Sequence, residues 1–243
     1  MSQKTAFAGV SENRNGISAV ALVVAGVVIL ALAGGAVWAF TPIPVTAEAQ
    51  QQREFQVDCQ YPKFRQIMVR KNATRAIVEN GGMQLKSEQL GDVQLDLSAD
   101  DRPILNAIRG KSRAEVAASK VLVVQLTNPY VKADQLKLKQ LADVKNQGMT
   151  VTTESIQAAG NLKTYQTKLQ ASPQDDESTK VQLQVSMEVT VEVPRLFAGR
   201  AESQVQSAAQ DGLQEQEEAI RALVKEFSDQ RLILPELGDK DPS

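Results

Sequence analysis

The chain has 243 residues, and its 27 basic and 29 acidic side chains nearly balance, so no global charge favours nucleic acid or a strongly charged partner. It contains no histidine, which removes the usual general base, the commonest metal ligand and every nucleophile that a histidine activates. Its single cysteine, Cys59, allows neither an internal disulfide nor a cysteine-based metal cluster. The composition predicts one domain with a hydrophobic core, no metal and no cofactor.

An apolar segment follows a short polar N-terminus, residues 1–15. Residues 16–40 carry no charge, and as a helix they would reach about 37 Å, enough to cross a bilayer with some tilt. The alternative is a cleaved signal peptide, because residues 47–49 resemble a small-x-small cleavage site, although the apolar run is longer than a typical signal sequence. We expect a retained transmembrane helix that contacts the lipid bilayer through residues 16–40.

The charges that flank this segment predict its orientation. Lys4 and Arg14 precede it, whereas only Arg53 follows closely. The positive-inside rule then predicts a single-pass membrane protein with a cytoplasmic N-terminus and a periplasmic or otherwise extracytoplasmic domain. Residues 41–53, rich in Pro, Ala and Gln, are expected to be a linker.

The folded domain is predicted to begin at residue 54 with a strand and two helices. Residues 54–61 read as a strand, and a helix follows from Pro62, with Phe64 and the pair Ile67 and Met68 on one face. A second short helix is expected over residues 72–79, ended by two glycines.

The middle of the chain reads as an antiparallel sheet of about six or seven strands, because short polar turns leave no room for crossover helices. Gly91 and Asp92 are expected to form a turn between two strands, and residues 102–109 could make one or two helical turns. The further predicted strands are residues 114–126, 132–144, 149–159, 162–171 and 181–193. The last of these alternates apolar and polar residues throughout and would span roughly 44 Å, which suggests a strongly curved sheet.

A long amphipathic helix closes the domain. Apolar residues recur at three- and four-residue steps over residues 198–227, which predicts a helix of roughly 28 residues, about 42 Å long. We expect it to lie along the concave face of the sheet. Gly212, in the middle of this helix, costs about 1 kcal/mol relative to Ala, so either the sheet approaches closely there or a void remains.

This order of elements resembles the helix-grip fold of the SRPBCC superfamily, which includes START lipid-transfer domains, Bet v 1-like proteins and polyketide cyclases. Residues 54–71, EFQVDCQYPKFRQIMVRK, resemble its first strand and helix, and residues 181–220 resemble its last strand, Pro-containing turn and gripping helix. The predicted fold class is α+β, with a transmembrane helix, a helix-grip domain over residues 54–228 and a polar tail, residues 229–243. The resemblance implies a pocket between sheet and helix, but no shared catalytic residues.

Binding of an apolar or amphipathic small molecule, such as a lipid, by a membrane-tethered domain is the first functional hypothesis. The candidate cavity residues are Phe64, Tyr165, Met187 and Leu213, and the Tyr165 hydroxyl could orient a ligand head group. Each of these side chains could equally be ordinary core. The alternative is an accessory or assembly subunit that binds another protein and has a filled core.

An enzyme is the third hypothesis. The acidic pairs at residues 100–101, 175–176 and 217–218 are interpreted as solvated charge, because neighbours in sequence point apart on a helix or strand. The chain has no Gly-rich phosphate loop and no nucleophile elbow. We therefore expect a protein that is not an enzyme.

Overall fold

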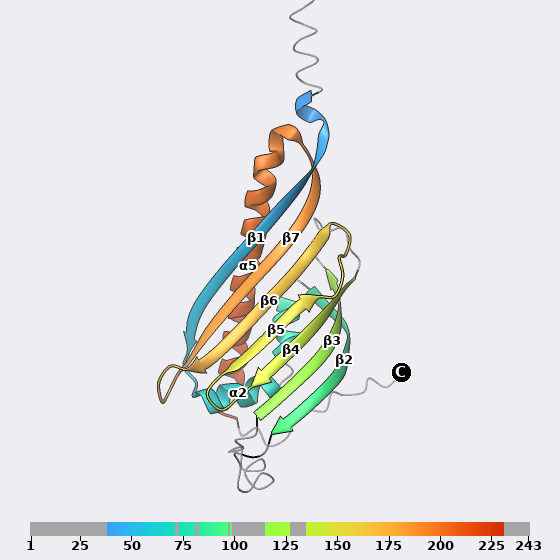
Figure 1. Ribbon diagram of the computed structural model, residues 1–243. Helices are drawn as coiled ribbons and strands as arrows, with labels where there is room; N and C mark the ends of the chain where they lie inside the picture. The colour runs from blue at the N-terminus through green and yellow to red at the C-terminus, as the bar shows by residue number, and fades with distance from the viewer. Residues whose placement is uncertain are drawn as a thin grey trace, which may run out of the picture.

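The computed structural model describes residues 38–70, 73–80, 83–96, 98, 115–126 and 135–230. These residues form one curved sheet and the helices that cover it (Figure 1). The elements, in chain order, are β1 (Pro42–Val57), α2 (Tyr61–Arg70), α3 (Ala73–Asn80), β2 (Met83–Asp96), β3 (Glu115–Leu126), β4 (Leu136–Val144), β5 (Met149–Ser155), β6 (Leu162–Pro173), β7 (Thr179–Pro194), η1 (Arg195–Phe197) and α5 (Ala198–Phe227).

The sheet has seven strands in the order β1-β7-β6-β5-β4-β3-β2, and every neighbouring pair is antiparallel. The predicted α+β class and antiparallel sheet are confirmed. The 30-residue helix α5 packs against β1 and β7, and the short helix α3 packs against α5 and β2 (Figure 1). The predicted gripping helix is therefore present, and its buried residues join the inward side chains of the strands in one core.

The predicted linker over residues 41–53 is instead most of strand β1. This strand pairs with β7 along its whole length, from Pro42 opposite Pro194 to Val57 opposite Thr179. Its side chains alternate between exposed and at least partly buried. Two prolines are tolerated near its start because β1 is an edge strand, whose outer amides need no partner strand. The domain thus begins before residue 54.

The prediction of a single-pass membrane protein is corrected. A helix that crosses a bilayer needs about 20 predominantly apolar residues, and none of the helices in the described part of the chain meets this requirement. The longest of them, α5, is long enough but carries charged residues along its exposed side. Residues 1–37, which hold most of the predicted span, lie outside the described residues, and of the span itself only residues 38–40 are described.

The predicted turn at Gly91 and Asp92 is a bulge within one continuous strand, β2. The register against β3 shifts between Leu90 and Val93, so one extra residue lies on β2. The Asp92 amide donates a hydrogen bond to Ser119 Oγ at 3.0 Å. A side chain at Gly91 would place its Cβ 2.5 Å from the same oxygen, which explains the glycine. Residues 102–109, the predicted helical turns, lie outside the described residues.

Cys59 is part of the core between sheet and helices. It is 6% exposed, and burial raises the pKa of its thiol. The side chain therefore behaves as a small hydrophobic residue rather than as a reactive thiolate.

Gly212 does not mark a close approach of sheet and helix, because a Cβ added there would meet no neighbouring atom within 4 Å. We expect Gly212→Ala to raise the free energy of unfolding by about 1 kcal/mol, since alanine removes the backbone entropy cost of glycine in a helix interior. Urea denaturation of the full chain measures this change. Gly91→Ala is the control. It should destabilise the protein, because the added Cβ would collide with Ser119. A loss of stability in Gly212→Ala would contradict the prediction.

Candidate ligand cavity

A cavity of about 160 Å³ lies on the inner face of the sheet, under helix α3 and beside α5. Strands β3 to β7 form its wall, and α2, α3, the start of β2 and one residue of α5, Gln216, contribute to its lining. Most of the lining side chains are aliphatic. The predicted pocket lies between the sheet and the C-terminal helix, whereas this cavity is covered mainly by α3, and α5 contributes only Gln216 to its lining.

Small side chains in one cross-strand row make the space. Ala118 of β3 stands directly opposite Ala142 of β4, and the row continues through Val151 and Leu169 to Leu183. All five residues line the cavity. Because the two alanines carry only methyl groups, the wall recedes at β3 and β4, below α3.

Buried polar side chains interrupt this apolar wall. Gln140 of β4 and Thr153 of β5 are 8% and 6% exposed, and the Gln140 amide donates a hydrogen bond to Thr153 Oγ1 at 3.2 Å. Thr74 of α3 donates its hydroxyl to Gln140 Oε1 at 3.0 Å, so the network also ties α3 to the sheet. All three residues line the cavity, and the bonds among them offset the cost of burial.

Tyr165 is the one predicted ligand-cavity residue that lines the cavity. Burial raises the pKa of Tyr165 to about 12, although a hydrogen bond with Gln216 acts in the opposite direction, so the hydroxyl stays protonated near neutral pH. The lining does not include Phe64, Met187 or Leu213. Phe64 and Leu213 are buried in the core, and Met187 is partly buried against it.

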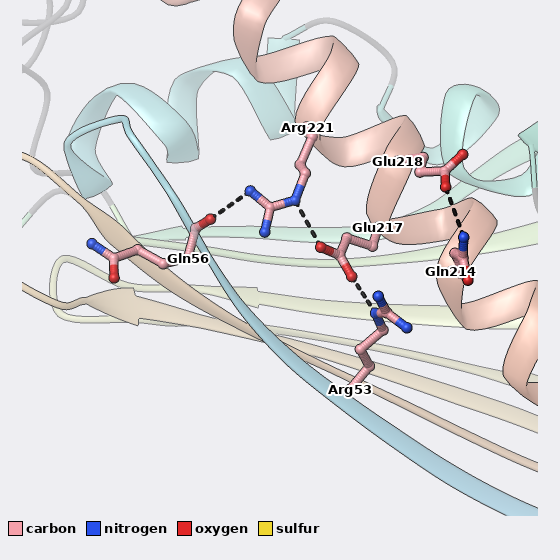
Figure 2. A network of polar contacts seen from close by, with 6 residues as sticks. All are labelled: Arg53, Gln56, Gln214, Glu217, Glu218 and Arg221. Atoms are coloured by element: carbon pink, nitrogen blue, oxygen red, sulfur yellow. Dashed lines mark hydrogen bonds and ion pairs between the residues drawn. The ribbon is translucent and has the colours of Figure 1, made fainter.

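A second polar cluster lies outside the cavity and joins α5 to β1 (Figure 2). Glu217 is 9% exposed, forms an ion pair with Arg53 of β1 and accepts a hydrogen bond from Arg221 Nε at 2.7 Å. Arg221 also donates to the Gln56 carbonyl at 2.8 Å, and its guanidinium lies 4.9 Å from the ring centroid of Phe55. The cluster fixes the helix against the edge strand.

The acidic pair at residues 217–218 is therefore divided between two environments. Glu218 is exposed and accepts a hydrogen bond from Gln214, four residues earlier, at 3.1 Å. Glu217 faces the sheet, so its interpretation as solvated charge is wrong. Burial acts to raise the pKa of the Glu217 carboxyl, but hydrogen bonds and charges from Arg221 and Arg53 outweigh it, and the net shift is downward.

A larger depression, of about 370 Å³, lies elsewhere, at the turn between β4 and β5. It is open, and its strand residues Asp143 and Gln170 are exposed. Its two lysines already have partners: Lys145 pairs with Asp143 at 2.9 Å, and Lys180 pairs with Glu54 at 2.7 Å. The smaller, mostly apolar cavity is therefore the better candidate site.

No protein-family model matches the chain, and no curated protein matches it. Among the solved structures that resemble it are an aromatase/cyclase from Streptomyces sp. R1128 (10% identity, 73% of this chain and 94% of that chain, TM-score 0.44), truncated norcoclaurine synthase from Thalictrum flavum (12%, 74% and 95%, 0.43) and a START superfamily protein from Mycobacterium smegmatis (12%, 73% and 97%, 0.40). The seven-stranded antiparallel sheet with the long helix α5 packed on it is the helix-grip arrangement that the sequence predicts. The likeness concerns the fold alone.

Proposed function

We propose that this domain binds a small apolar or amphipathic molecule in the cavity between sheet and helices. The observation that carries the proposal is a space of about 160 Å³ with an aliphatic wall into which a few buried polar side chains project. Pockets of this composition are typical of small-molecule sites, where the polar groups orient the ligand. Tyr165, Gln216 and Gln140 could serve this purpose.

The size of the cavity narrows the class of ligand. Pockets for drug-sized ligands measure about 300–1,000 Å³, whereas an apolar cavity of about 150 Å³ holds a molecule the size of benzene. A volume of about 160 Å³ favours a ligand with one ring or a short chain over a whole lipid.

The alternative function is an accessory subunit that binds another protein and has a filled core. The open volume beside Ala118 and Ala142 favours ligand binding over this alternative. Purification of the full chain from its source separates the two: a stoichiometric protein partner, with no small molecule detected by native mass spectrometry, would favour the accessory role.

A cavity-filling variant tests the proposal directly. We expect the full chain to bind 3-phenylpropanol in a calorimetric titration, and Ala118→Leu to weaken this binding about tenfold or more, equivalent to about 1.4 kcal/mol. The reason is that an isobutyl group would occupy the space that Ala118 leaves open.

The matched control is Ala117→Leu, the same substitution at the adjacent position of β3, where the side chain is exposed on the other face of the sheet. This variant should bind 3-phenylpropanol with the same affinity as the unchanged chain. Equal binding by both leucine variants, or no binding by the unchanged chain, would contradict the proposal.

A further inference from the structure

One cross-strand row on the inner face of the sheet is polar from β3 to β6. Lys120 stands opposite Gln140, Gln140 opposite Thr153, and Thr153 opposite Thr167. All four residues line the cavity. The adjacent rows on the same face are less polar: one holds the two alanines followed by aliphatic residues, and the other has Leu122 opposite Leu138 and Leu138 opposite Ser155. The row from Lys120 to Thr167 is therefore a polar belt in a mostly apolar wall.

Lys120 is the charged end of this belt. Lys168 also contributes to the lining, but strand alternation directs its side chain away from that of Thr167, toward the convex face. Among the described lining residues, Lys120 is thus the one whose charged side chain belongs to the inner face. Its ammonium forms an ion pair with Glu88 of β2, and the two side chains are 27% and 26% exposed.

The ammonium lies where the apolar inner face meets solvent. Leu90 of β2 stands opposite Lys120 and is 64% exposed, and Val93, in the next row, is 51% exposed. A molecule whose apolar body fills the cavity could therefore place a polar end at Lys120 without burying a charge deeply. Glu88 is a replaceable partner, because ion pairs that are partly exposed contribute little stability.

We propose that the ligand is a small amphipathic molecule with an anionic end, such as a carboxylate, which binds Lys120 in place of Glu88. This inference rests on the proposed function and specifies its ligand. The apolar part lies along the row of Ala118 and Ala142, and Gln140 and Thr153 provide neutral hydrogen-bonding groups beside the head. Hydrogen bonds between an ammonium and a carboxylate are stronger than those between neutral groups, so charge should determine which ligands are preferred.

Two probes with the same ring and chain test the role of charge: 3-phenylpropionate, an anion, and 3-phenylpropanol, its neutral counterpart. In calorimetric titrations of the full chain, we expect the acid to bind more tightly than the alcohol. Lys120→Met should weaken binding of the acid about tenfold and leave that of the alcohol within about twofold, because methionine keeps the aliphatic stem and removes the charge. Lys139→Met, on the exposed face of β4, is the matched control and should change the affinity for neither probe.

A second variant provides a test in the opposite direction. Glu88→Gln removes the competing carboxylate, so we expect it to tighten binding of the acid and leave the alcohol unchanged. Equal affinity for acid and alcohol in the unchanged chain, equal weakening of both by Lys120→Met, or no gain for the acid in Glu88→Gln would each overturn the inference. Binding of neither probe to the unchanged chain would instead count against the proposed function itself.

Discussion

Phe64→Ala is expected to lower the free energy of unfolding by about 3–5 kcal/mol, the range typical of large aromatic truncations in a core. Phe64 is 0% exposed on helix α2 and belongs to the cluster of buried side chains between helices and sheet. Removing its ring withdraws apolar surface from the core and leaves a void that the surrounding strands can only partly close. Urea denaturation should show a lower midpoint, with a slope close to that of the unchanged chain.

Phe40→Ala is the control for this substitution. Phe40 is 60% exposed, so the same chemical change should alter stability by no more than about 0.5 kcal/mol. Equal losses of stability in the two variants would contradict the assignment of Phe64 to the core.

Phe64 is one of the cavity residues predicted from the sequence. A binding measurement distinguishes contact with a ligand from packing in the core. Phe64→Leu should lower the free energy of unfolding, because Phe64 packs in the core. It should still bind 3-phenylpropanol with nearly unchanged affinity, because Phe64 is outside the cavity lining. A folded Phe64→Leu protein that has lost binding would show that the ring contacts the ligand.

The elements that the sequence predicts best are those with a long, uninterrupted period. The alternation over residues 181–193 and the helical pattern over residues 198–227 correspond to β7 and α5. A period of two held through thirteen residues is incompatible with a helix, and a three-to-four step held through eight turns is incompatible with a strand. Local sequence is therefore sufficient for these two elements.

The sequence predicts only the end of strand β1, and residues 42–53 escape because their alternation has little hydrophobic contrast. Its inward positions include Ala47, Ala49, Gln51 and Arg53, which are small or polar. Two of them, Ala47 and Ala49, are buried, but alanine signals a core position only weakly. What makes the segment a strand is its pairing with β7, more than a hundred residues later in the chain, and such a partner cannot be inferred from local composition.

The sequence could have indicated the polar residues of the cavity, but not how the strands align them. Lys120 and Gln140 each interrupt an apolar inward series in their own strand, and Thr153 follows two apolar inward residues, so this signal is present in the sequence. Their alignment in one row, and that of Ala118 with Ala142, depends on strand register. Register is determined by pairing across the whole sheet, so the position of the void follows only from the structure.

Glu217→Ala is expected to lower the free energy of unfolding by about 2 kcal/mol. The Glu217 side chain is 12% exposed, and its carboxylate bridges Arg53 of β1 and Arg221 of α5, whose side chains are 40% and 46% exposed. Its loss would leave two cations close together at the contact between helix and edge strand (Figure 2). Because both arginines reach solvent, the cost should lie below the range of about 3–5 kcal/mol for breaking a fully buried pair.

The same site predicts a pH dependence with a defined sign. The pKa of the Glu217 carboxyl is lower in the folded state, because the interactions with Arg221 and Arg53 outweigh burial. Its stabilising contribution is therefore complete above the unfolded pKa of about 4.3 and is lost as the pH falls through the lower folded value. Glu217→Gln should flatten this acid loss in denaturation midpoints measured from neutral pH downward. The control is Glu218→Gln, at the exposed neighbour, which should leave the dependence of the midpoint on pH unchanged. Parallel pH profiles for the unchanged chain, Glu217→Gln and Glu218→Gln would refute this role of Glu217.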